Sequence, residues 1–174
     1  MKRSRFLDSF VIVLVACLGV TGYVLWASSQ GLAGFPLDDA WIHQTYARNL
    51  ADTGQLAYLP GQPSAGSTSP AWSFLLSIGY LVGLDFRVWA FVMGGLSLAA
   101  TAWLAYRLFL RLPPLQHLSA QASPSVAALL AGLFCATEWH LVWAAASGME
   151  TAFFTALSLA LVEYFSSQVA TRQS

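Results

Sequence analysis

Two adjacent carboxylates, Asp38 and Asp39, are the residues of this chain whose type and spacing best suit chemistry. They follow the first long apolar run and open a polar segment in a mostly apolar chain. Neighbouring carboxylates at a membrane surface cost desolvation and mutual repulsion, and they are typical of sites that bind a cation, a proton or a substrate. The alternative is a solvated helix start, because Asp caps helix N-termini well.

A further acid, Glu150, occurs much later in the chain, two residues after Gly148. Gly148 is expected to break a helix, which would place Glu150 in the first turn of the next helix. A carboxylate suits the helix dipole there, and this is the structural interpretation. The functional interpretation is that Glu150 faces Asp38 across a cavity on the same side of a membrane.

The composition indicates what kind of scaffold must position these acids. The 174 residues are 57% hydrophobic and 9% charged, with a mean hydropathy of +0.60, whereas soluble domains carry about 25% charged residues. We therefore expect an all-α integral membrane protein with a single membrane domain, 1–174. The net charge of zero gives no indication of nucleic-acid binding. Cys17 and Cys135 lack the spacing of metal ligands or of a disulfide framework.

Four apolar stretches are predicted to be transmembrane helices, which need about 20 mainly apolar residues. Their approximate ranges are 10–29, 88–107, 124–146 and 150–168. Within the outer loop, 30–87, a further uncharged stretch covers residues 71–84. That stretch is short for a span, so it favours an interfacial or re-entrant helix.

The distribution of positive charge predicts the orientation. With four spans, six of the eight Lys and Arg residues lie on the cytoplasmic side; if residues 71–84 also crossed, only four would. The positive-inside rule therefore favours four spans in the cell membrane, with a cytoplasmic N-terminus. The same topology gathers five acids on the outer face, namely Asp38, Asp39, Asp52, Asp85 and Glu150.

Residues 38–53 of the outer loop are predicted to form a helix, because acids occupy its start and Gly54 would end it. Asp39, His43 and Tyr46 recur at helical spacing, so they can share one face. The next segment, 59–70, is rich in Gly, Pro and Ser, which predicts a loop. Its hydroxyl and amide groups could bind a sugar, or the segment could be a plain connector.

Glu138 interrupts the third apolar stretch. It follows Pro124 by about 21 Å of helix, at 1.5 Å per residue, which places it in the outer third of the bilayer. A buried acid within a span costs about 3 kcal/mol on insertion scales. We therefore expect Glu138 to face the protein interior or a wet cavity, with His140 nearby.

Three segments resemble motifs of the GT-C superfamily of membrane glycosyltransferases, which includes dolichyl-phosphate-mannose-dependent mannosyltransferases and bacterial arabinose and aminoarabinose transferases. Residues 38–50, DDAWIHQTYARNL, resemble the first outer motif of that superfamily. Residues 60–72, PGQPSAGSTSPAW, resemble its outer loop and the start of its interfacial helix, and residues 147–151, SGMET, resemble its second acidic motif. The resemblance extends over nearly the whole chain.

The resemblance implies a function and an active site. Such enzymes take a sugar from a polyprenyl-phosphate carrier in the membrane and pass it to an acceptor hydroxyl on the outer face, usually with inversion. Asp38 would be the base, because a carboxylate within hydrogen-bond range can take the proton of that hydroxyl. Asp39 and Glu150 would position the acceptor or bind a divalent cation, Mg²⁺ or Mn²⁺.

Substrate-binding residues are also implied by the resemblance. His43 and Arg48 would meet the phosphate of the carrier, by charge pairing. Tyr46, Ser67 and Thr68 would contact the sugar or the acceptor through their hydroxyl groups.

Two hypotheses follow from the length of the chain. Members of the superfamily commonly have several hundred residues and nine or more spans, and some carry Arg in place of Thr45. The first hypothesis is the N-terminal catalytic portion of such an enzyme, with a C-terminal bundle or another membrane subunit as its partner. The alternative is a non-catalytic membrane subunit or a truncated remnant, since displacing a base by about 1 Å can cost roughly a hundredfold in rate.

Overall fold

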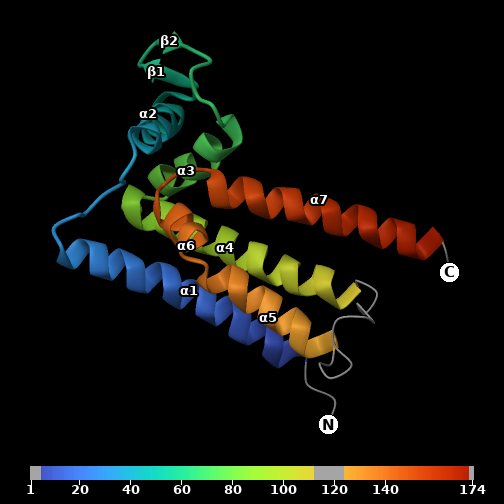
Figure 1. The fold of residues 1–174 in the computed structure, drawn as a ribbon. Helices are drawn as coiled ribbons and strands as arrows, with labels where there is room; N and C mark the ends of the chain where they lie inside the picture. The colour runs from blue at the N-terminus through green and yellow to red at the C-terminus, as the bar shows by residue number, and fades with distance from the viewer. Residues whose placement is uncertain (1–4, 112–123, 173–174) are drawn as a thin grey trace.

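The structure, a computed structural model, describes residues 5–111 and 124–172. Lys2 and Arg3, two of the six basic residues that the orientation places on the cytoplasmic side, lie outside the described residues. Within these ranges the chain forms seven helices and one short β-hairpin (Figure 1). Their bounds are α1 Arg5–Ser29, α2 Asp38–Thr53, β1 Ala57–Leu59, β2 Gln62–Pro63, α3 Pro70–Leu81, α4 Phe86–Arg111, α5 Pro124–Thr137, α6 Trp139–Ala146 and α7 Thr151–Arg172.

The long helices lie roughly side by side, and α2, the hairpin and α3 form a cap over one end of them (Figure 1). At this cap end α1 ends, and α4 and α7 begin. At the other end α4 and α7 are joined by a shared carboxylate: Glu163 Oε1 lies 2.6 Å from Arg107 and 2.7 Å from Arg111. The five acids expected on one face lie at the cap end, because they belong to α2 or flank the starts of α4 and α7.

Two helices, α1 and α4, are long and apolar enough to cross a membrane, which confirms a mostly helical architecture with candidate membrane spans. A third span would require α5 and α6 together, and these two helices meet at an angle of 49°. The fourth predicted span coincides with α7, which is not among the candidate spans of the described residues. The number of four spans is therefore not confirmed.

The bend between α5 and α6 occurs at Glu138, where a single helix over 124–146 had been expected. Glu138 has an extended backbone, with φ −61° and ψ 122°, and its side chain accepts a hydrogen bond from the backbone N–H of Leu141. It is thus the N-cap of α6, a role that suits a carboxylate. Its Oε1 lies 2.6 Å from His140 Nδ1, as expected from the sequence. The Glu138 side chain remains 24% exposed, so it is not directed into a closed core.

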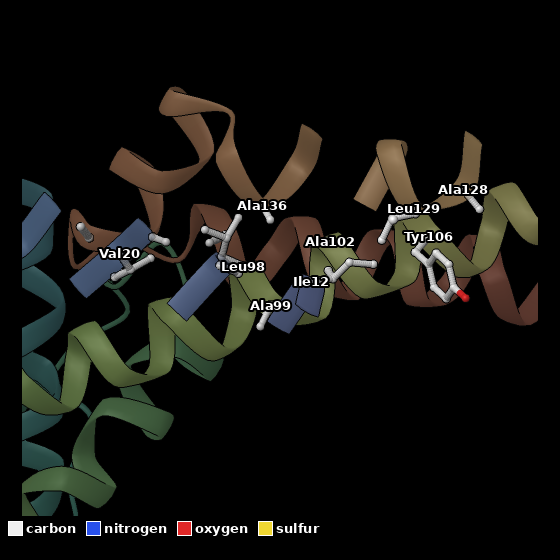
Figure 2. Close-up of a cluster of buried hydrophobic side chains, with 13 residues drawn as sticks. Ile12, Val20, Leu98, Ala99, Ala102, Tyr106, Ala128, Leu129 and Ala136 are labelled. Atoms are coloured by element: carbon white, nitrogen blue, oxygen red, sulfur yellow. The ribbon is translucent and has the colours of Figure 1, made fainter. Parts of the chain in front are cut away.

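Small side chains dominate the contacts between the long helices. Figure 2 shows one cluster of buried side chains from α1, α4, α5, α6 and α7, in which alanines pack among larger residues such as Ile12 and Leu98. Small residues let helix backbones approach closely in membranes. The crossing of α4 and α6 is the tightest example, because a Cβ atom at Gly94 would overlap the carbonyl oxygen of Ala145.

In the cap, the two helices α2 and α3 were predicted from the sequence, whereas the β-hairpin between them was not. Helix α2 has the predicted bounds and ends at Gly54, which has φ 71° and donates its N–H to Leu50 O at 2.9 Å. Helix α3 is 12 residues long, too short to span, as predicted for residues 71–84, and its interfacial position stays a prediction. The predicted loop, 59–70, overlaps a hairpin, because Leu59 belongs to β1 and Gln62–Pro63 form β2. Asn49 fixes this hairpin, because its Nδ2 donates to both Ala57 O and Tyr58 O at 2.9 Å.

Asp85 caps the start of α4, and removing this cap is expected to destabilise the helix. Asp85 Oδ1 accepts the backbone N–H of Arg87 at 2.9 Å and of Val88 at 3.1 Å. Asp85→Ala should lower the free energy of unfolding by about 1 kcal/mol, as is typical of a lost N-cap. Asp85→Asn is the control, because Asn caps equally well. Unfolding in mixed detergent micelles gives the free energy of unfolding of both variants. If Asp85→Ala has the same free energy of unfolding as the wild type, Asp85 does not stabilise α4 as a cap.

The same cap should depend on pH. The Arg87 side chain donates a hydrogen bond to Asp85 and thereby lowers the pKa of Asp85, and the backbone N–H of Val88 lowers it further. A carboxyl whose pKa is lowered by folding stabilises the fold above its unfolded pKa, about 3.9, and loses this contribution as the pH falls through its folded pKa. The stability difference between the wild type and Asp85→Ala should therefore shrink as the pH falls below about 4.

Candidate functional site

Histidine 43 connects the three sequence motifs at the cap end. Its Nε2 lies 3.0 Å from Glu150 Oε2, which joins α2 to the segment before α7. Its Nδ1 lies 3.2 Å from Ser73 Oγ on α3, and Ser73 Oγ lies 2.9 Å from Ser67 Oγ in the loop before α3. We call these four residues the His43 cluster. Residues from positions 43 to 150 thus meet in one polar group.

The His43 cluster is largely buried, but one of its members reaches the surface. The side chain of His43 is 1% exposed and that of Glu150 is 22% exposed, while Ser67 and Ser73 are buried. The contact between His43 Nε2 and Glu150 Oε2 has the distance of an ion pair but not the alignment of a hydrogen bond. Both atoms are buried and keep hydrogen-bonding capacity, and the exposed part of the Glu150 side chain can accept a hydrogen bond from a group at the surface.

The position of Glu150 depends on the tight turn at Gly148. Gly148 has φ 79°, a conformation that glycine adopts without strain. A Cβ atom there would overlap the ring of Phe35, and Trp72 Nε1 on α3 donates to Gly148 O at 3.0 Å. Glu150 itself precedes α7, and its carbonyl accepts the N–H of Phe154 at 2.7 Å. Glu150 was expected in the first turn of this helix, but it lies directly before the first helical residue, Thr151.

The predicted catalytic acids of the first motif, Asp38 and Asp39, lie at the start of α2 and are exposed. Asp38 Oδ1 accepts the N–H of Asp39 at 3.1 Å. In the part of the chain that the structure describes, no ion pair or hydrogen bond links either acid to Glu150, and no group of three His, Cys, Asp or Glu residues could hold a metal ion. The base role of Asp38 and the metal role of Asp39 and Glu150 stay predictions.

The predicted substrate-binding residues divide into buried and exposed groups. Tyr46 is buried, and its hydroxyl contacts Ser64 Oγ at 2.8 Å and accepts the N–H of Gly66 at 3.0 Å. Tyr46 therefore holds the loop that carries Ser67. Arg48 and Thr68 are exposed, so their side chains are open to a ligand at the cap surface.

Replacing Tyr46 by Phe should loosen this loop. The change removes both contacts of the hydroxyl, each worth about 1 kcal/mol net, and leaves the packing of the ring intact. Amide hydrogen exchange at Gly66 is therefore expected to accelerate. Tyr58→Phe is the matched control, because the side chain of Tyr58 is exposed. Equal exchange at Gly66 in the wild type and in Tyr46→Phe would rule out this function of the hydroxyl.

A second polar contact joins α2 to α3. The hydroxyl of Tyr80 donates to Gln44 Oε1 at 3.0 Å. Burial raises the pKa of Tyr80, which outweighs the opposite influence of the Arg48 charge. The phenol therefore stays protonated and able to donate at neutral pH. This contact helps to fix the face of α2 that presents His43 to Ser73.

Two residues that build the site, Trp72 and Ser73, were not predicted from the sequence. Trp72 belongs to the second motif and Ser73 follows it directly. The side chains of both are directed from α3 toward the segments that carry the acids, since Trp72 reaches Gly148 and Ser73 reaches His43. A serine in an apolar helix commonly bonds to its own helix backbone, so the available signal was the Ser and Trp pair in the first turn after Pro70.

No family model, curated protein or solved structure matches this chain. The resemblance of the three motifs to GT-C glycosyltransferases therefore stays a hypothesis, to be judged by the chemistry of the site.

Proposed function

We propose that this chain is the N-terminal catalytic portion of a membrane glycosyltransferase that moves a sugar from a polyprenyl-phosphate carrier to an acceptor hydroxyl. The observation that carries the proposal is the His43 cluster, which joins all three motifs at one end of the helices. A catalytic site assembled from distant segments needs such a connection, because its groups must be held in a fixed relative position.

The proposed reaction is a single displacement at the anomeric carbon of the sugar. The acceptor oxygen forms a bond to that carbon while Asp38 takes the acceptor proton. The bond from the anomeric carbon to the phosphate oxygen breaks, and the polyprenyl phosphate leaves with the electron pair. Glu150, oriented by His43, positions the acceptor by accepting a hydrogen bond. Arg48, exposed on α2, pairs with the negative charge of the leaving phosphate.

The proposed site faces the outside of the cell membrane, in a topology of four spans formed by α1, α4, the α5–α6 pair and α7. The segregation of charged residues supports this orientation, because Arg107 and Arg111 lie at the end opposite the acidic cap. The short helix α3 then rests at the outer interface, where a lipid-linked sugar and a water-soluble or lipid acceptor can meet.

A transfer assay tests the proposal. Membranes containing this chain, together with any membrane subunit that co-purifies with it, are supplied with radiolabelled polyprenyl-phosphate mannose, glucose or arabinose. We expect transfer of one of these sugars to an endogenous acceptor, dependent on this chain. If none of these donors yields chain-dependent product, the catalytic proposal fails.

A second candidate function is a non-catalytic membrane subunit. It is favoured by the way in which His43, Tyr46 and Ser67 direct their polar atoms to partners within the chain. In that case the chain would co-purify with a larger membrane enzyme whose activity requires it but tolerates Asp38→Asn. Loss of transfer in Asp38→Asn separates the two candidates in favour of catalysis.

A further inference from the structure

A groove runs between α1 and α4 on the membrane side of the cap. It consists of two cavities of about 690 Å³ and 340 Å³. Val24, Val88 and Phe91 line both cavities, so the two adjoin along α1 and α4. The smaller cavity is lined by apolar side chains almost throughout, and its far end is formed by Cys17 and Leu96. This groove is separate from the His43 cluster.

The depth of the groove matches one leaflet of a bilayer. On α1 its lining extends from Ser28 at the cap end to Cys17, a distance of about 16 Å at 1.5 Å per residue. The hydrocarbon core of a bilayer is about 30 Å thick, so the groove reaches about its midplane. Trp41 also lines the mouth, and tryptophan favours the level of the lipid headgroups. One acyl chain of an outer-leaflet lipid fits this depth.

The mouth of the groove carries one positive and one negative side chain. Arg87 and Asp85 both line the larger cavity, and both are exposed, at 45% and 43%. Arg87 Nη2 lies 3.2 Å from Asp85 Oδ2, and Asp85 is fixed in place by its cap contacts to α4. A guanidinium pairs well with a phosphate, and a carboxylate pairs well with an ammonium group. The pair of side chains is therefore complementary to a headgroup that carries both charges.

We propose that this groove binds a zwitterionic glycerophospholipid of the outer leaflet, with one acyl chain between α1 and α4, the phosphate on Arg87 and the headgroup ammonium on Asp85. A lipid with a purely anionic headgroup fits less well, because Asp85 would repel its charge. A polyprenyl phosphate fits less well for the same reason, and its chain is longer than the groove. The inference is independent of the proposed transfer reaction.

Native mass spectrometry of the detergent-purified protein tests the inference. The protein is mixed with equal amounts of phosphatidylethanolamine, phosphatidylglycerol and a polyprenyl phosphate. We expect phosphatidylethanolamine to be retained about fivefold more than either anionic lipid, the ratio that one exposed ion pair can provide. Equal retention of the three, or a preference for either anionic lipid, would overturn the proposal.

Three variants locate the binding site. Arg87→Gln should reduce retention of phosphatidylethanolamine about fivefold, and Gly95→Leu should reduce it by filling the groove at a position that borders Val20. Asp85→Asn keeps the helix cap and should shift the preference toward phosphatidylglycerol. Leu161→Phe, at an exposed position of α7, is the control and should leave the retention of phosphatidylethanolamine unchanged. Unchanged retention in both Arg87→Gln and Gly95→Leu would show that the lipid binds elsewhere.

Discussion

Replacing Asp38 by Asn is expected to abolish sugar transfer, with a fall in rate of at least about a hundredfold, the lower end of the range for a lost general base. Asn keeps the size of the side chain and an oxygen that can accept the N–H of Asp39, but it cannot take the proton of the acceptor hydroxyl. Because Asp38 is exposed at the start of α2, the fold should survive the change. The measurement is the initial rate of label transfer from the donor that the wild type uses.

Asp52→Asn is the matched control for Asp38→Asn. Asp52 is an exposed acid in the last turn of the same helix, so the change removes an equal charge at a distance from the proposed site. We expect the control to keep nearly the full rate. An Asp38→Asn protein with the rate of the wild type would exclude Asp38 as the base, and equal losses in both variants would point to a general effect of charge on the cap.

Replacing His43 by Leu is expected to lower the free energy of unfolding by about 2 kcal/mol and to reduce transfer as well. Leu fills a similar volume but removes the hydrogen-bonding contact with the buried Ser73 and the close approach of His43 Nε2 to Glu150 Oε2. An unpaired buried polar group costs about 1–3 kcal/mol. Unfolding in mixed detergent micelles measures the loss, and the transfer assay shows whether Glu150 needs His43 for its position.

His140→Leu is the matched control for His43→Leu. His140 also contacts a glutamate, Glu138, but the His140 side chain is 71% exposed. Exposed ion pairs contribute about 0–1 kcal/mol, so the loss of stability should be clearly smaller. If the two histidine variants lose the same stability, the burial of His43 has no energetic consequence and the cluster is not an organised site.

The sequence was sufficient to predict the elements whose signals are local. Helix α2 has its predicted bounds because acids start it and Gly54, in the left-handed conformation, ends it. The short helix α3 and the break at Gly148 were predicted for similar reasons. The proximity of Glu138 and His140 was also predicted, since two positions so close in the chain can meet without any knowledge of the tertiary fold.

Features that depend on distant contacts were not predicted. The bend at Glu138 requires its side chain to turn back onto the backbone of α6, which the apolar pattern over 124–146 does not show. The hairpin exists because Asn49 of α2 bonds to two carbonyl groups of β1. Likewise, the pairing of His43 with Ser73 depends on how α3 packs against α2, and a serine in an apolar helix carries no signal of such a partner.

The central claim is that the two acidic motifs form one site through His43 and Glu150, and a double-mutant cycle between these residues tests it most directly. The free energies of unfolding of the wild type, His43→Leu, Glu150→Gln and the double variant are measured under the same conditions. Residues in contact typically show coupling energies of about 0.5–3 kcal/mol, and we predict a value in that range. Strictly additive effects would contradict the contact, and with it the proposed site.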